Sequence, residues 1–202
     1  MSDLMHMTAV FGDGGRYRYS LSREWDPRIE QLCWIMLNPS IASADRDDPT
    51  IRRCISFAKM WAFGGIVVVN LFGLVATYPV QLMRAKDPVG PHNDEAIEQA
   101  IAGRRVVCAW GDVYASRIKF GDRVTSVMAL LERTRTNPLC MGLTKSGHPR
   151  HPVRLGSNTT MKRFVLKDTG KLFRSIKYEA DSPKVAVGPI DIYGDGSRRK
   201  TP

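Results

Sequence analysis

Four short apolar runs, separated by amphipathic segments, constrain the fold of this chain more than any other feature. The runs cover residues 32–37, 66–69, 105–110 and 139–143. Short runs that are apolar on both faces are typical of strands in a parallel sheet, which is buried on both sides. After the first run, Asp48 is a good helix N-cap and Pro49 suits the first helical position. We therefore predict an α/β protein, a three-layer sandwich around a central, mainly parallel four-stranded sheet.

Weaker patterns indicate the remaining elements. Residues 16–21 alternate between polar and aromatic side chains, which predicts a short strand or an edge strand. The helix after Pro49 has its apolar residues at a spacing of three or four up to Trp61. Asn93 or Asp94 can cap a further helix. In addition to that helix, which carries apolar residues as far as 101, we expect helices at residues 80–83 and 116–131.

The composition excludes several classes of protein. The chain has 202 residues, of which 43% are hydrophobic and 25% charged, so it can bury a sizeable core and is not a disordered chain. Its longest apolar run is far shorter than the ~20 residues that span a bilayer, and its N-terminus lacks the pattern of a secretory signal. The cysteines are far apart in apolar segments, as expected of reduced thiols rather than a metal site: Cys33, Cys54, Cys108 and Cys140. These observations favour a soluble, cytoplasmic protein with no metal and no cofactor.

The positive charge is unevenly distributed along the chain. The formal net charge is +10, and residues 156–202 hold ten Lys or Arg and five Asp or Glu, which gives half of it. Such a surface favours phosphate backbones or acidic partners, although a solvated basic tail explains it equally well. We expect a single α/β domain over residues 1–160 and a basic C-terminal extension over 161–202. Gly, Pro and charged residues dominate from about 181, where we expect disorder.

Polar residues follow each of the four apolar runs. Because the carboxyl ends of parallel strands lie along one rim of the sheet, where ligands bind, we expect these residues to converge. An asparagine amide offers a donor and an acceptor, which suits the edge of a nucleobase, and histidine can act as a general acid or base. The residues that we expect at the rim are Asn38, Pro39, Ser40, Asn70, Phe72, Trp110, Gly111, His148 and His151.

Each candidate also has a simpler structural interpretation. Asn38 before a proline is a common turn residue, Asn70 can merely end a strand, and His148 and His151 can be surface loop residues. Asp48 can act as a helix cap rather than as a base. The sequence has no phosphate-binding Gly-x-x-x-x-Gly-Lys motif, no dinucleotide-binding Gly-x-Gly-x-x-Gly after a strand and no Gly-x-Ser-x-Gly elbow. These absences disfavour nucleoside triphosphatases, Rossmann enzymes and ordinary α/β hydrolases.

Several motifs resemble the family called domain of unknown function 1643, which is found in bacteria and phages. They are residues 34–40, 47–50, 69–72, 76–77, 109–111 and 142–149, and the resemblance covers roughly residues 10–155. Their order is also similar to that of the uracil-DNA glycosylase superfamily, which implies a glycosylase-like fold. In this resemblance Asn38 matches the residue that positions water and Asn70 the residue that reads the base. His148 matches the catalytic histidine, with His151 as a substitute.

Two functions therefore remain open. The first is a base-acting enzyme, an N-glycosylase-like hydrolase in which Asn38, Asp48 and His148 are catalytic. A nucleotide would be flipped into the rim, and Lys145, Arg150 and Arg154 would contact its phosphates. The alternative is a non-catalytic module that binds DNA or a nucleotide. A weaker possibility is an enzyme that acts on a free nucleotide.

Overall fold

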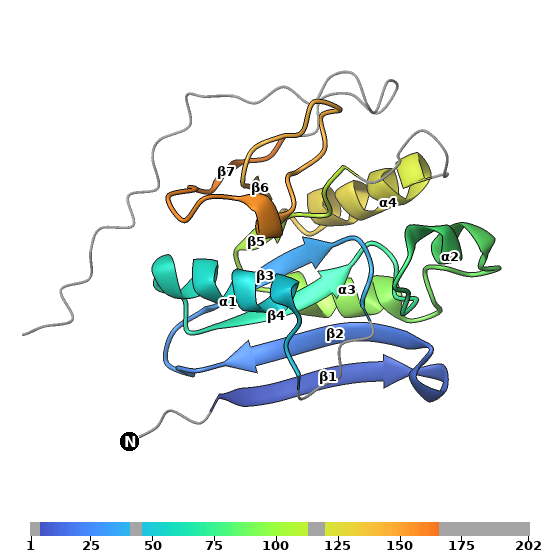
Figure 1. Ribbon diagram of the computed structural model, residues 1–202, viewed down its shortest axis with the longest axis horizontal. Helices are drawn as coiled ribbons and strands as arrows, with labels where there is room; N and C mark the ends of the chain where they lie inside the picture. The colour runs from blue at the N-terminus through green and yellow to red at the C-terminus, as the bar shows by residue number, and fades with distance from the viewer. Residues whose placement is uncertain (1–4, 41–45, 113–119, 166–202) are drawn as a thin grey trace, which may run out of the picture.

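The structure is a mixed α/β fold with thirteen elements of secondary structure in its described part. The computed structural model describes residues 5–40, 46–112 and 120–165 (Figure 1). The strands are β1 His6–Gly12, β2 Tyr17–Glu24, β3 Gln31–Met36, β4 Gly65–Asn70, β5 Val106–Cys108, β6 Leu139–Cys140 and β7 Lys162–Arg163. The α-helices are α1 Pro49–Met60, α2 Pro79–Arg84, α3 Asn93–Ile101 and α4 Phe120–Arg133, and two 3-10 helices are η1 Asp13–Gly15 and η2 Pro152–Arg154.

The strands form one sheet in the order β1-β2-β4-β3-β5-β6-β7. The neighbours β4–β3, β3–β5 and β5–β6 run parallel, while β1–β2, β2–β4 and β6–β7 are antiparallel. The predicted α/β class is confirmed, and the four predicted strands are β3, β4, β5 and β6, which run parallel to one another. The predicted number of strands is wrong, because the sheet of the described residues has seven strands and is mixed. The strands β1 and β7 were not predicted. They lie at the two edges, where each is paired on one side only. The apolar run of β1 has just three residues, Ala9 to Phe11, and β7 has no apolar residue.

Helices cover both faces of the sheet, and alternate side chains of the strands supply the core on each side. In β3, Trp34 is fully buried in a cluster with Phe57 of α1. The next residue, Ile35, belongs to a second cluster with Ile97 of α3 and Leu131 of α4. Figure 1 accordingly shows α1 and α3 on opposite sides of β3 and β4. The carboxyl ends of the parallel strands therefore lie between two packed layers.

Strand β2 is longer than predicted and is not an edge strand. It lies between β1 and β4 and covers Tyr17–Glu24. Its pairing with β1 is irregular, since Arg18 faces Phe11 and Ser20 faces Val10, which leaves Tyr19 as an extra residue. A β-bulge of this kind changes which face the side chains occupy. Arg18 consequently lies on the α1 side of the sheet, while Tyr19 joins the core on the α3 side.

The start of α3 also differs from the prediction. Its N-cap is His92, which makes no side-chain capping hydrogen bond, so neither Asn93 nor Asp94 caps the helix. The side chain of Asn93 instead points into the protein and donates to the carbonyls of Asn70 and Leu71. These buried carbonyls at the end of β4 need donors, and that requirement decides the orientation of Asn93. The predicted helix at 116–131 is observed from Phe120, and residues 116–119 lie outside the described part.

The described helices include none that is long and apolar enough to cross a membrane.

Candidate functional site

A cavity of about 200 Å³ opens at the carboxyl ends of β3 and β4, next to the first turn of α1. Its walls combine apolar and polar side chains. The apolar and aromatic residues are Met36, Leu37, Ile51, Val68 and Trp110, and the polar ones are Arg18, Asn38, Ser40, Asp48, Thr50, Asn70 and His151. A pocket with a few converging polar groups on an apolar background is the usual form of a small-molecule site.

The cavity brings together many of the residues predicted from the sequence, but not all of them. Asn38, Ser40, Asp48, Asn70, Trp110 and His151 line it. Among the others, Phe72 is buried in the core on the α3 side, and Pro39, Gly111 and His148 are buried without lining the cavity. The cationic residues Lys145, Arg150 and Arg154 do not line the cavity either, and all three are exposed to solvent. The side chain of Phe72 packs in the cluster on the α3 side of the sheet and does not reach the cavity.

Asn70 is the last residue of β4 and is only 2% exposed. Its side chain lines the cavity, and no hydrogen bond to its amide is found in residues 5–40, 46–112 and 120–165. A polar side chain that has no hydrogen bond within the protein can bond to water or to a ligand in an adjoining cavity. Asn70 therefore offers a donor and an acceptor to a polar ligand in this cavity.

Asn38 differs from Asn70, because its amide nitrogen is already bound to the protein. Its Nδ2 donates to the carbonyl of Ala76 at 2.8 Å and to that of Pro39 at 3.0 Å. Both amide hydrogens are thus used to hold the loop after β3. The oxygen Oδ1 remains as an acceptor, which suits Asn38 for holding a water molecule rather than for reading a donor–acceptor edge.

Asp48 caps α1, as its sequence context predicts. Its Oδ1 accepts from the backbone N–H of Ile51 at 2.8 Å, and its Oδ2 accepts from the Oγ of Ser40 at 2.7 Å. A carboxylate has about four acceptor positions, so these two bonds leave it able to accept more. Asp48 therefore combines the structural role with a place in the wall of the cavity.

Of the two candidate histidines, His151 reaches the cavity and His148 lies behind it. His148 accepts from the indole Nε1 of Trp110 through its Nδ1 at 3.4 Å. His151 packs against Gly111, whose φ is +77° and where an added Cβ would lie 3.1 Å from the Cβ of His151. A residue with a side chain at position 111 would be strained and would also press on the imidazole.

The surroundings of both imidazoles favour the neutral form by lowering the pKa. Burial lowers the pKa of His151, Asp48 opposes this change and Arg154 adds to it. Burial also lowers the pKa of His148, against the effect of Asp112. In His151 the Nδ1 accepts from the N–H of Val153 at 3.4 Å. The neutral ring therefore carries its proton on Nε2, which makes that nitrogen a donor.

The sequence analysis missed Arg18, which lines the cavity and is only 3% exposed. Burial lowers the pKa of its guanidinium, with Asp48 opposing and Arg23 adding to the effect. The alternation of polar and aromatic residues in this segment predicted a strand but did not single out Arg18 as a site residue. No local signal reveals the bulge that turns Arg18 inward. Thr50, which was also missed, follows the recognised Asp48-Pro49 cap directly and could have been inferred from it.

The described residues contain no group of three or more His, Cys, Asp or Glu that could hold a metal ion. The cysteines Cys33, Cys54, Cys108 and Cys140 are free and buried. Burial raises the pKa of the Cys33 thiol to about 12. Such thiols are poor nucleophiles at neutral pH, so the cysteines belong to the core.

These observations define a mixed α/β protein with a polar cavity at the carboxyl ends of its parallel strands. The model of the family described as "Protein of unknown function (DUF1643)" matches residues 18–153, and the chain belongs to this family. The matched region begins at Arg18 and extends past His151, so it contains every residue that lines the cavity. No curated protein and no solved structure matches the chain.

Proposed function

We propose that this protein is a nucleobase-acting hydrolase of the N-glycosylase type, with the base bound in the cavity at the ends of β3 and β4. The observation that carries the proposal is the buried amide of Asn70, which faces the cavity without a partner in the described part of the chain. A cavity of roughly 150 Å³ accommodates benzene, so one of about 200 Å³ accommodates a single six-membered ring. An amide matches the donor–acceptor edge of such a base.

The remaining lining residues supply the other roles that the reaction needs. The base would be flipped out of a nucleic acid and placed beside Trp110. Asn38 Oδ1 and Asp48 would hold a water near the sugar C1′, and Asp48 would accept its proton. As the water oxygen bonds to C1′, the C1′–N bond breaks and its electron pair goes to the base. His151, protonated on Nε2, would donate a hydrogen bond to the base as this charge develops.

In this proposal His151 replaces His148 as the histidine that acts on the base. The resemblance to the uracil-DNA glycosylase superfamily matches His148, but His151 lines the cavity and His148 lies behind Trp110. Arg18 adds hydrogen-bond donors that favour carbonyl or phosphate oxygens. Lys145, Arg150 and Arg154 are all exposed and would contact the phosphates of a nucleic acid.

One observation favours the alternative, a module that binds DNA or a nucleotide without catalysis. Asp48 already accepts from Ser40 and from Ile51, and the amide nitrogen of Asn38 is bound to two carbonyls. Both residues thus have structural roles that do not require a reaction. A binding module would retain the role of Asn70 and lose those of Asp48 and His151.

The proposal is tested by incubating the protein with a panel of damaged and modified DNAs and measuring released bases by mass spectrometry. Asn70→Ala should reduce release by about tenfold or more, because the base edge loses its hydrogen bonds. Asn158→Ala, which changes an exposed asparagine, is the matched control and should leave release unchanged. His151→Gln should reduce release more than His148→Gln.

The outcomes separate the two functions. If the protein releases no base but binds a DNA or a nucleotide, and Asn70→Ala weakens that binding, the binding module is correct. If Asn70→Ala and Asn158→Ala behave alike in both release and binding, the cavity does not hold a base and the proposal is wrong.

A further inference from the structure

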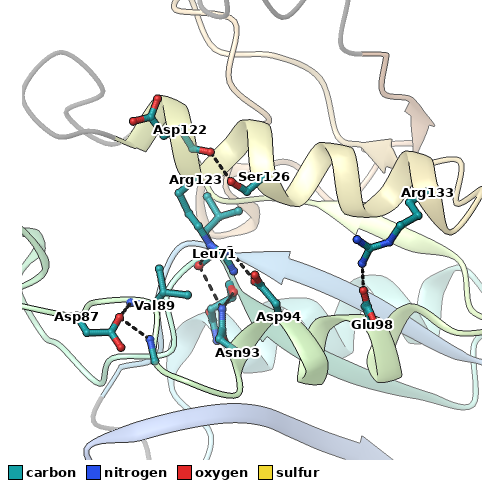
Figure 2. A network of polar contacts seen from close by, with 12 residues as sticks. Leu71, Asp87, Val89, Asn93, Asp94, Glu98, Asp122, Arg123, Ser126 and Arg133 are labelled. Carbon is teal, nitrogen blue, oxygen red and sulfur yellow. Dashed lines mark hydrogen bonds and ion pairs between the residues drawn. The ribbon is translucent and has the colours of Figure 1, made fainter.

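The backbone that follows Asn70 is held by side chains from the opposite face of the sheet. The Nδ2 of Asn93, in α3, donates to the carbonyl of Asn70 at 3.0 Å and to that of Leu71 at 3.2 Å. The Nε of Arg123, in α4, donates to the same Leu71 carbonyl. Figure 2 shows Asn93 and Arg123 converging on this carbonyl from the two helices. Two helices are therefore tied to the end of one strand.

The peptide groups at this point are fixed on both sides. The N–H of Leu71 donates to the carbonyl of Met36 at 2.9 Å, and the N–H of Phe72 donates to that of Leu37 at 3.0 Å. The carbonyls of Asn70 and Leu71 receive the donors of Asn93 and Arg123 instead. The regular pairing of β3 with β4 ends at Asn70. The side chains of Asn93 and Arg123 thus restrain these two carbonyls as the hydrogen bonds of a neighbouring strand would.

The two donors are themselves buried and closely packed. Asn93 is fully buried and Arg123 is only 7% exposed. The Nη1 of Arg123 lies 2.6 Å from the Oδ1 of Asp94, which pairs α4 with α3. A Cβ added at Gly73 would lie 3.1 Å from the Oδ1 of Asn93. The amide of Asn93 therefore has little freedom to move away from the strand end.

We propose that Asn93 and Arg123 are positioning residues for Asn70. By fixing the Asn70 carbonyl, which belongs to the Asn70–Leu71 peptide plane, and the Leu71 carbonyl of the next plane, they set the direction in which the Asn70 side chain enters the cavity. This inference rests on the proposed function, in which Asn70 reads the base. Asn93 and Arg123 do not line the cavity, so they act through Asn70 rather than on the ligand.

A second ion pair between the same helices provides a matched control. Arg133 of α4 pairs with Glu98 of α3; the Arg133 side chain is exposed and that of Glu98 is partly buried. Figure 2 shows this pair along the two helices, away from Leu71. Arg133→Ala removes a contact between α3 and α4 without removing a donor to the end of β4. If Arg123 only joined the helices, the two substitutions would have the same kind of effect.

The first measurement needs no ligand. NMR spectra would follow the side-chain amide of Asn70 and the hydrogen exchange of the Leu71 and Phe72 amides. Asn93→Ala and Arg123→Ala should shift the Asn70 side-chain signals and accelerate both exchange rates, whereas Arg133→Ala should change neither. In Arg123→Lys, the Asn70 signals and the two exchange rates should lie between those of the wild type and of Arg123→Ala. The reason is that a lysine cannot donate to Leu71 and to Asp94 through a planar fork.

The second measurement is a double-mutant cycle on base release or on nucleotide binding. Asn93→Ala should lower kcat/KM or the binding constant by about fivefold or more in the wild-type background. It should have little further effect in the Asn70→Ala background, because two residues that act through one contact are not additive. Thermal melting shows whether each variant folds. If Asn93→Ala does not fold, Arg123→Lys takes its place in the cycle with Asn70→Ala.

Two results would overturn the inference. One is additivity of the Asn93 and Asn70 substitutions, and the other is an Arg133→Ala variant that shifts the Asn70 amide as Arg123→Ala does. A wild-type protein that neither releases nor binds a base would refute the proposed function only. The NMR comparison would still decide whether Asn93 and Arg123 hold Asn70 in place.

Discussion

The two faces of the sheet use polar side chains in opposite ways. On the α1 face, Arg18, Asp48 and His151 surround an open cavity. On the α3 and α4 face, Asn93 and Arg123 are bound to backbone carbonyls inside a closed core. Polar groups that face open space can bind a ligand, while polar groups tied to the backbone stabilise the fold. The same strand end serves both, since Asn70 faces the cavity and its carbonyl is held from behind.

The packed cluster behind the sheet indicates how the small cavity in front of it can keep one shape. The cluster on the α3 side includes buried residues from α2, α3 and α4, and it packs directly beneath the ends of β4 and β5. On the other side of the sheet, the described residues place α1, whose first turn forms part of the cavity wall. We therefore expect substitutions behind the sheet to lower stability and substitutions in front of it to lower binding. The following predictions test that division, beginning with the largest effect.

The largest effect is expected in the closed core. Leu131 is only 1% exposed in α4, so Leu131→Ala should lower the free energy of unfolding by about 2–5 kcal/mol through lost burial and the cavity that remains. Chemical denaturation measures this loss. Met60→Ala, at a position 47% exposed in α1, should stay within about 0.5 kcal/mol of the wild type. A folded Leu131→Ala protein that also loses base binding would contradict the division between the faces.

A smaller effect is expected at the first turn of α1, where Asp48 belongs to both stability and the site. Asp48→Ala removes the cap on Ile51 and should cost about 0.5–2 kcal/mol. Asp48→Asn should keep the cap, because asparagine is an equally good N-cap, and should leave the melting temperature nearly unchanged. Both substitutions should abolish base release. An Asp48→Asn variant that retains full release would show that Asp48 is only a cap.

The sequence indicated several residues that line the cavity but not all of them, because some of the signals are local and others depend on long-range pairing. The Asp48-Pro49 cap is local, and the polar residues after Met36 and Val69 stand at ends of parallel strands, whose common rim is a general rule. Arg18 could not be predicted, because its direction depends on the bulge between β1 and β2. The assignment of the histidine depends on how the chain after β6 folds back onto Gly111, which brings His151 to the cavity.

The donors behind the sheet were hidden for a related reason. Asn93 has the local pattern of a helix cap, and that interpretation is wrong because its amide donates to carbonyls more than twenty residues away. The edge strands β1 and β7 were likewise missed, since an edge strand needs only one partner and tolerates exposed side chains. Long-range pairing, rather than local preference, determines each of these features.

The smallest effect is expected from pH, and it compares the histidine in the cavity with the histidine behind it. The folded-state pKa values of His148 and His151 lie below the ordinary value of 6.5, mainly because of burial. Between the folded value and 6.5 the unfolded chain binds more protons, so the free energy of unfolding rises with pH in that window. Stability should therefore be complete above about pH 6.5 and should be lost as the pH falls through the folded pKa values.

Urea denaturation at pH 7.5 and at pH 5.5 measures this loss of stability. The variants of His148 and His151 show how much of the loss each histidine causes. His148→Gln and His151→Gln should each reduce the difference in stability between the two pH values, because each removes one group that must be buried uncharged. A ligand in the cavity would further shield His151 from water but would leave His148 behind Trp110 as it is. Bound base should accordingly make the remaining pH dependence of the His148→Gln protein steeper, while that of the His151→Gln protein should not change. A ligand that alters both equally would show that His151 has no special place in the cavity.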